Sequence, residues 1–252
     1  MKKIAFFVEG ETEYLFISEL LKKMAGTRKI NVIAEKLSGG GKKQPTRIAF
    51  LSLESTLQPN ATYEARIYVS GTDNRVDTDI QDFHQNLQTT HSITEYAMIV
   101  GLRDLKGQKP DLSPNTLSDL PKMELLAKVA IKNCVLKDFI ASNIIIAVYE
   151  IEAWFLSEYT HFDRIDTILT PSFIASNIGF NPQTEDMSLR PEPAIDLHNI
   201  YQLGVPPKFY SKKANQRERT ISHLDYTFLY NTVAAKVTKL KKLMGLMDIF
   251  FA

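Results

Sequence analysis

The chain of 252 residues has almost no cysteine and no long apolar segment. Its single cysteine, Cys134, excludes an internal disulfide and a metal site built from several thiolates. No apolar run approaches the roughly 18 to 20 residues that a membrane-spanning helix requires, and the amino terminus lacks the apolar stretch of a signal peptide. We therefore expect a cytoplasmic protein with no membrane partner.

Several signatures of catalysis and ligand binding are also missing. The five histidines have no spacing typical of a zinc site, and no serine lies in a nucleophile elbow. The glycine-rich stretch 38–45 fails as a phosphate-binding P-loop because a second lysine, not a hydroxyl residue, follows Lys42. This stretch remains a candidate basic flap in which Lys42 and Lys43 contact a phosphate backbone.

The net charge of +1 indicates no class of partner by itself, but basic residues concentrate near the carboxyl end. Residues 208–242 contain nine basic and two acidic side chains, a local excess of seven positive charges. Such a cluster is typical of a surface that binds a polyanion. Lys212, Lys213 and Arg217 are the candidate contacts to nucleic acid, and the alternative is an ordinary solvated helix face.

The hydrophobic content of 44% is ample for a packed core. Unbroken apolar runs predict buried strands, and helical spacing after the first run predicts an α/β protein with a mainly parallel central sheet and helices on both faces. The predicted strands are Ile4–Val8, Ile30–Ala34, Ala65–Ser70, Tyr96–Val100 and Asn143–Tyr149. We expect an α/β core over residues 1–160 and a helical part over 161–252, or one continuous domain.

Two further helices are predicted between these strands. One is expected over residues 48–57, ending before a proline. The other is expected from about residue 122 to 139, with Leu125, Leu126, Val129, Ile131, Cys134, Val135 and Phe139 facing inward. At the carboxyl end, the apolar and lysine-rich segment 237–251 is expected to dock on the body of the protein or on a second subunit.

Acidic side chains follow three of the predicted strands. Glu9 follows the first, Asp104 follows the fourth, and Glu150 and Glu152 follow the fifth. The carboxyl ends of parallel strands form the edge at which α/β proteins bind ligands. The alternative for the first strand is structural, because acids that precede or open a helix also stabilise its dipole.

Two of these stretches resemble a known family. VEGETE at residues 8–13 resembles the VEG-x-TE signature of Toprim domains, the metal-dependent catalytic module of primases, type II topoisomerases and OLD-family nucleases. EIEAW at residues 150–154 resembles the E-x-E-A-W segment of a bacterial Toprim-like branch related to the OLD nucleases and associated with mobile elements and phage defence. Residues 210–212 resemble the Tyr-x-Lys segment of the same branch. Trp154 itself is expected to be a core anchor.

The resemblance implies a Toprim-like topology and a site that binds Mg²⁺ or Mn²⁺. Glu9, Asp104 and Glu152 are the implied metal ligands, and Glu9, Glu13 and Lys106 are the candidate catalytic residues. This chain departs from the family at one point, because Lys106 stands where Toprim proteins have the second acid of an Asp-x-Asp pair. Either Glu152 compensates as a ligand, Lys106 contacts phosphate directly, or the site has lost its metal.

The expected function is therefore metal-dependent phosphodiester chemistry on DNA or RNA, as in a nuclease of a mobile-element or phage-defence system. The alternative is a catalytically degenerate module that binds nucleic acid or a protein. A nucleotide-handling enzyme is a third possibility. A second defence-system protein and a second copy of the chain are possible partners.

Overall fold

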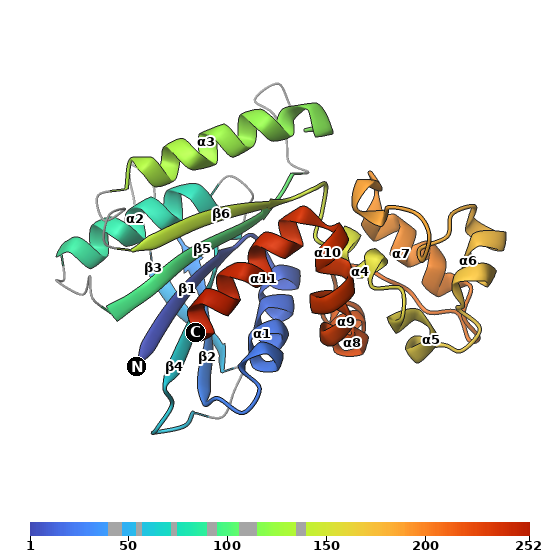
Figure 1. Cartoon of the computed structure of the whole chain (residues 1–252), viewed down its shortest axis with the longest axis horizontal. Helices are drawn as coiled ribbons and strands as arrows, with labels where there is room; N and C mark the ends of the chain where they lie inside the picture. The colour runs from blue at the N-terminus through green and yellow to red at the C-terminus, as the bar shows by residue number, and fades with distance from the viewer. Residues whose placement is uncertain (40–46, 54–56, 72–74, 90–94, 106–114, 135–139) are drawn as a thin grey trace. The chain divides into compact units, whose positions relative to one another are not determined.

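The protein is built on a six-stranded sheet, seen in the computed structural model of Figure 1, which describes residues 1–39, 47–53, 57–71, 75–89, 95–105, 115–134 and 140–252. The strand order is β3-β2-β4-β1-β5-β6. Strand β1 pairs in parallel with β4 and β5, β4 pairs in parallel with β2, and β2 pairs antiparallel with β3. The strands are β1 (Lys2–Val8), β2 (Ile30–Ser38), β3 (Arg47–Leu53), β4 (Tyr63–Val69), β5 (Tyr96–Asp104) and β6 (Ala141–Ala147). The prediction of an α/β fold with a mostly parallel sheet is confirmed.

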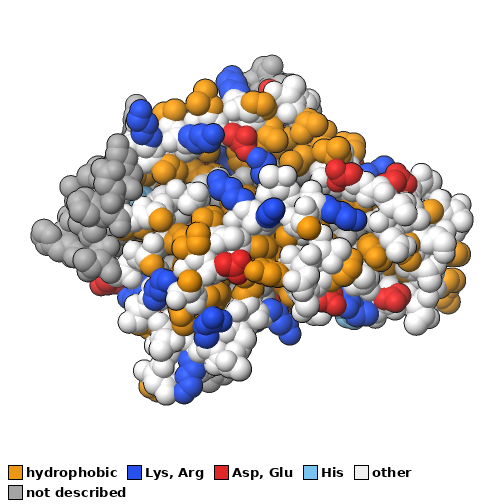
Figure 2. Space-filling view, viewed as in Figure 1, with side chains coloured by type: hydrophobic (Ala, Val, Ile, Leu, Met, Phe, Trp, Pro, Cys, Tyr) orange, Lys and Arg blue, Asp and Glu red, His pale blue; other side chains and the backbone are white. Residues whose placement is uncertain are grey.

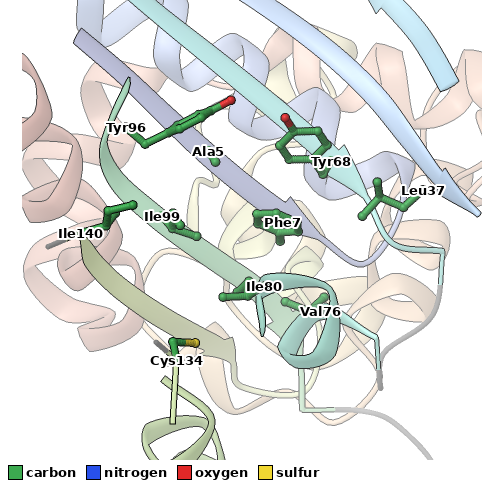
Figure 3. Close-up of a cluster of buried hydrophobic side chains, with 10 residues drawn as sticks. All are labelled: Ala5, Phe7, Leu37, Tyr68, Val76, Ile80, Tyr96, Ile99, Cys134 and Ile140. Atoms are coloured by element: carbon green, nitrogen blue, oxygen red, sulfur yellow. The ribbon is translucent and has the colours of Figure 1, made fainter. Parts of the chain in front are cut away.

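The predicted strands form because their apolar runs are covered on both faces. In β1, every side chain from Ile4 to Val8 is buried. On one face of the sheet, the ring of Phe7 contacts the ring of Tyr68, with centroids 4.9 Å apart, and the ring of Phe83, with centroids 5.2 Å apart. Figure 3 shows this buried cluster, which also contains Cys134. Cys134 is thus the small core residue that its apolar neighbourhood predicts.

The helix predicted over residues 48–57 is wrong for the part that the structure describes. Residues Arg47–Leu53 form β3, an edge strand in which Leu37 of β2 lies opposite Ile48. The backbone hydrogen bonds offered by β2 decide the outcome, since pairing with a neighbouring strand is a tertiary interaction that local spacing does not register.

Three helices accompany the sheet: α1 (Glu11–Ala25), α2 (Val76–Thr89) and α3 (Leu120–Lys132). At the start of helix α1, the Gly10 N–H donates to Glu13 Oε2 over 2.9 Å, which is one half of a capping box, because Gly10 has no side chain to accept the reciprocal hydrogen bond. Glu11 and Glu13 lie in its first turn, where a negative charge stabilises the helix dipole. This helix confirms the helical spacing that follows the first apolar run.

The inward face predicted for α3 is wrong at Leu125, Leu126 and Val129, which are exposed, with Leu126 at 55%. Ala127 is buried and Ile131 packs against the core cluster. At roughly 100° per residue, Ala127 and Ile131 share one side of the helix, whereas the three exposed residues occupy the other. Because apolar side chains lie on two sides of this helix, the sequence alone does not show which side faces the core. Figure 2 shows apolar surface in the region where Figure 1 shows α3.

The chain after β6 is helical and forms most of a second compact unit. The sheet unit comprises Met1–Arg103, Ser118–Ile146 and Gly245–Ala252, and the helical unit comprises Asp104–Leu117 and Ala147–Met244. The later helices are α4 (Glu152–Ser157), α5 (His161–Ile165), α6 (Pro171–Ile178), α7 (Pro193–Gln202), α8 (Ala214–His223), α9 (Tyr226–Phe228), α10 (Ala234–Lys236) and α11 (Thr238–Phe251). The helical carboxyl-terminal part is confirmed, and the expected domain boundary near residue 160 stays a prediction.

The end of α11 docks on the sheet unit. The Tyr63 ring contacts those of Phe250 and Phe251 at 5.4 and 5.2 Å, and the Tyr63 hydroxyl donates to the Phe251 carbonyl. Lys2 Nζ donates to the Ile249 carbonyl over 3.2 Å. The expected docking of this tail on the body of the protein is therefore confirmed. None of the helices in the described ranges is both long enough and apolar enough to cross a membrane.

Candidate metal centre

Three acidic side chains meet in the helical unit. Asp104, Glu150 and Glu152 each offer a carboxylate oxygen, and these oxygens lie within 4.8 Å of one another. All three side chains are buried. Like charges this close repel strongly away from bulk water unless a cation compensates them. Asp104, Glu150 and Glu152, here called the acidic triad, could therefore hold a metal ion.

The triad forms where β5 and β6 end. Asp104 is the last residue of β5, and the N–H of Leu105 donates to the carbonyl of Ala147, the last residue of β6, over 2.9 Å. The next turn passes through Tyr149, which has a φ of 60°. A positive φ in a bulky residue costs about 1 to 3 kcal/mol and persists only where the surrounding structure enforces it. This strained turn immediately precedes Glu150.

The backbone after the turn holds Asp104 in place. Ile151, which caps the amino end of α4, donates its N–H to Asp104 Oδ1 over 3.0 Å. Glu152 is the first residue of α4, so two carboxylates of the triad lie where the helix dipole favours negative charge. The following Trp154 is buried, which confirms its expected role as a core anchor.

A segment between α7 and α8 supplies further polar partners of the triad. The Tyr210 hydroxyl donates to Glu152 Oε1 over 2.7 Å. Lys212 Nζ lies 3.3 Å from Glu150 Oε1 and 3.8 Å from Glu152 Oε1. The Tyr210 side chain is buried, whereas that of Lys212 is 50% exposed. Lys212 thus offsets part of the negative charge while remaining accessible from outside.

Neighbouring helices hold the backbone of that segment. His198 of α7 lies with Nδ1 2.9 Å from the Tyr210 carbonyl oxygen. From α8, Arg217 donates to the Lys212 carbonyl and Arg219 donates to the Phe209 carbonyl. Three side chains on two helices therefore fix a short loop, and the loop carries the Tyr210 and Lys212 side chains to the triad.

Sequence reasoning found part of this centre. It named Asp104 and Glu152 as metal ligands and Lys212 as a basic contact, and the structure brings these three together. It placed Glu150 at the strand end without including it among the ligands. The available signal was the Glu-x-Glu pair itself, two acids that follow the same strand and stand only two positions apart. Tyr210 was noted only as part of a motif.

Glu9 and Glu13 lie in the sheet unit and are not members of the triad. Glu9 follows β1, and its carbonyl accepts the Gly71 N–H over 2.8 Å. Glu13 is buried, and its carboxylate accepts the Gly10 N–H at the start of α1. The structure thus gives Glu13 a local structural role, and the metal-binding and catalytic roles of both residues stay predictions.

The other predicted contacts divide into two groups. Lys42, Lys43 and Lys106 lie outside the described residues. Lys213 is exposed and precedes α8, and Arg217 engages the backbone of its own chain as described above. Their contacts with nucleic acid remain predictions.

The fold and the acidic triad define an α/β protein with a buried carboxylate centre where two strands end. Comparisons with protein-family models, with curated proteins and with solved structures gave no match to this chain.

Proposed function

We propose that the protein is a metal-dependent nuclease in which the acidic triad binds Mg²⁺ or Mn²⁺. The observation that carries the proposal is the burial of three carboxylates within 4.8 Å of one another. Their donor atoms are all carboxylate oxygens, which is the ligand type that hard divalent cations prefer. The chemistry of the residues present therefore fits the ion.

The residues around the triad suit phosphodiester cleavage. A bound divalent ion would stabilise negative charge on the phosphodiester and activate a water molecule. Tyr210 orients Glu152 through its hydrogen bond. Lys212, half exposed and beside two of the carboxylates, is available to a phosphate that approaches from solvent.

The resemblance of the chain to the Toprim-like branch related to the OLD nucleases agrees with this proposal. On that reading the sheet has Toprim-like topology, Glu9 is a further ligand, and Glu13 and Lys106 assist catalysis. Lys42, Lys43, Lys213 and Arg217 hold the backbone of DNA or RNA. A second defence-system protein or a second copy of the chain would then complete the assembly.

Calorimetric titration with MnCl₂ and MgCl₂, combined with cleavage of labelled DNA and RNA, tests the proposal. The isosteric substitution Glu152→Gln removes one ligand charge and should weaken Mn²⁺ binding by more than the roughly 10- to 100-fold that loss of a ligand's hydrogen-bonding partner costs. Glu192→Gln, at an exposed position in the same unit, is the matched control. Metal affinity that is equal in Glu152→Gln and the wild type would reject the metal centre.

The predicted role of Glu9 needs its own comparison. Glu9→Ala should abolish metal-dependent cleavage, whereas Glu11→Ala, at an exposed position nearby in the chain, should not. If pure Glu9→Ala protein cleaves as well as the wild type, Glu9 is not part of the site. The metal centre at the triad is then tested by the Glu152→Gln experiment alone.

A second candidate function is a degenerate module that binds nucleic acid or protein without chemistry. The ion pairs of Lys212 with Glu150 and Glu152 favour it, because an ammonium group already supplies a cation to the triad. Lys106 in place of an acid points the same way. Binding of nucleic acid with no uptake of Mn²⁺ or Mg²⁺ would select this function over the nuclease.

A further inference from the structure

A small apolar pocket adjoins the acidic triad. It has a volume of about 220 Å³ and is lined by Ala194, Ile195 and His198 of α7 and by Tyr210, Ser211 and Lys212. Pockets for drug-sized ligands begin at roughly 300 Å³, so this one suits a single ring system and not a larger molecule. All six lining residues belong to the helical unit.

The pocket and the triad share two residues. Tyr210 donates its hydroxyl hydrogen to Glu152, and Lys212 is ion-paired with Glu150 and Glu152. A group seated in the pocket therefore lies against the same two side chains that contact the carboxylates. A ligand with a flat apolar part and an attached anionic group matches this arrangement, with the apolar part in the pocket and the anion toward Lys212.

One lining residue of the pocket, His198, belongs to a pair of rings in contact. The His198 ring is half-buried, and the ring of Phe209 lies 5.8 Å from it at an angle of 44°. Ile195, which lines the pocket, is 54% exposed, and Phe209, whose ring contacts the lining residue His198, is 48% exposed. Phe and His rings are the surfaces on which unpaired bases stack in proteins that bind single strands.

We propose that this pocket receives an unpaired nucleobase, so that the protein acts on single-stranded or locally unpaired nucleic acid. The proposal rests on the proposed function and adds its substrate class. The base packs against Ile195 and His198, which line the pocket, and the adjoining phosphate lies toward Lys212. The exposed Lys212 and Lys213 supply the positive charge that the rest of the strand requires. A base held in a duplex cannot enter, because its faces are covered by neighbouring bases.

Fluorescence anisotropy with short labelled strands tests the inference. One strand carries thymine throughout, and the second has the same length and charge but abasic sites in place of the bases. Titrations are made with Ca²⁺ and again with EDTA. In at least one of the two conditions, the wild type should bind the thymine strand about fivefold or more tightly than the abasic strand, as expected for one stacked base.

Two variants test whether the preference for the thymine strand over the abasic strand arises at the pocket. Ile195→Ser, at an exposed apolar position that lines the pocket, should lose most of the discrimination between the two strands, whereas Leu189→Ser should keep it. Leu189 is the matched control because it is an apolar residue of the same unit, 52% exposed, that does not line the pocket. Retention of the full preference by Ile195→Ser would overturn the placement of the base.

Other results would overturn the inference outright. These are equal affinity for the two strands, tighter binding of a duplex than of the thymine strand, affinity for free thymidine monophosphate equal to that for the strand, or no measurable binding of either strand. The outcome is separable from that of the metal experiment. A protein that prefers the thymine strand but takes up no Mn²⁺ would keep the base pocket and reject the metal centre.

Discussion

The hydroxyl of Tyr210 donates a hydrogen bond of 2.7 Å to Oε1 of Glu152, although the two residues are 58 positions apart in the chain. Both side chains are buried, so the contact is shielded from competing water. Through it, the loop before α8 controls the orientation of one carboxylate of the acidic triad.

Removing that hydroxyl should affect both stability and metal affinity. Tyr210→Phe leaves a buried carboxylate without this donor, which should lower the free energy of unfolding by about 1 to 3 kcal/mol. Mn²⁺ affinity should fall by about 10- to 100-fold, the usual effect of losing a hydrogen bond to a metal ligand. Urea denaturation and calorimetric titration measure the two effects.

Tyr226→Phe is the control for this prediction. The buried Tyr226 hydroxyl donates to the Ile221 carbonyl in the same unit, so its loss should reduce stability without changing metal affinity. Equal metal affinity in the two variants would show that Tyr210 does not orient a ligand.

Replacing Lys212 should shift stability in opposite directions with and without metal. Lys212→Met removes the positive charge that lies 3.3 Å from Glu150, so the metal-free protein should lose up to about 1 kcal/mol, or roughly 2 to 4 °C of melting temperature. The same change should strengthen Mn²⁺ binding a few-fold, because a competing cation is gone. Thermal melts over a range of MnCl₂ concentrations, with Lys213→Met as the charge-matched control, test both signs. If the melting temperature of Lys212→Met does not change with the concentration of MnCl₂, the degenerate module is favoured.

Truncating a buried leucine and truncating an exposed leucine of the sheet unit should change the free energy of unfolding by different amounts. Leu20→Ala removes a fully buried side chain of α1 and should cost about 2 to 5 kcal/mol. Leu126→Ala, on the exposed side of α3, should change the free energy of unfolding by less than about 0.5 kcal/mol. Urea denaturation compares them, and a large loss in Leu126→Ala would mean that another part of the molecule or a partner covers that side.

The imidazole of His84 predicts a specific pH dependence. His84 is buried with Nε2 3.0 Å from Ser142 Oγ, and burial lowers its pKa from the ordinary value near 6.5. Well above pH 6.5 the imidazole is neutral in both the folded and the unfolded protein and contributes no pH dependence. As the pH falls below 6.5, the unfolded chain takes up a proton that the folded protein still excludes, so stability is lost until the pH reaches the folded pKa.

Comparison with His84→Gln isolates this contribution from that of the carboxylates. The stability of the wild type relative to the variant should decrease as the pH is lowered from 7 to about 5. Chemical denaturation at several pH values gives the difference. A difference that stays constant over this interval would show that the pKa of His84 is the same in the folded and unfolded chain.

The sequence by itself determined the elements whose signal is local. Continuous apolar runs such as Ile4–Val8 specify buried strands, and a glycine followed by acids specifies the start of α1, since both depend on neighbouring residues alone. The position of Asp104 and Glu152 after such runs was enough to place them at the ends of strands. For the same reason the α/β class and a mostly parallel sheet could be predicted.

Only the tertiary structure decided which separated residues meet. Segment 48–53 became a strand because β2 offered it hydrogen bonds, and α3 turned Ala127 inward because the sheet unit's core lay on that side. Tyr210 and Lys212 reached the triad because His198, Arg217 and Arg219 hold their loop. Contacts of this kind depend on the path of the whole chain, and the free energy that selects them comes from partners far away in sequence.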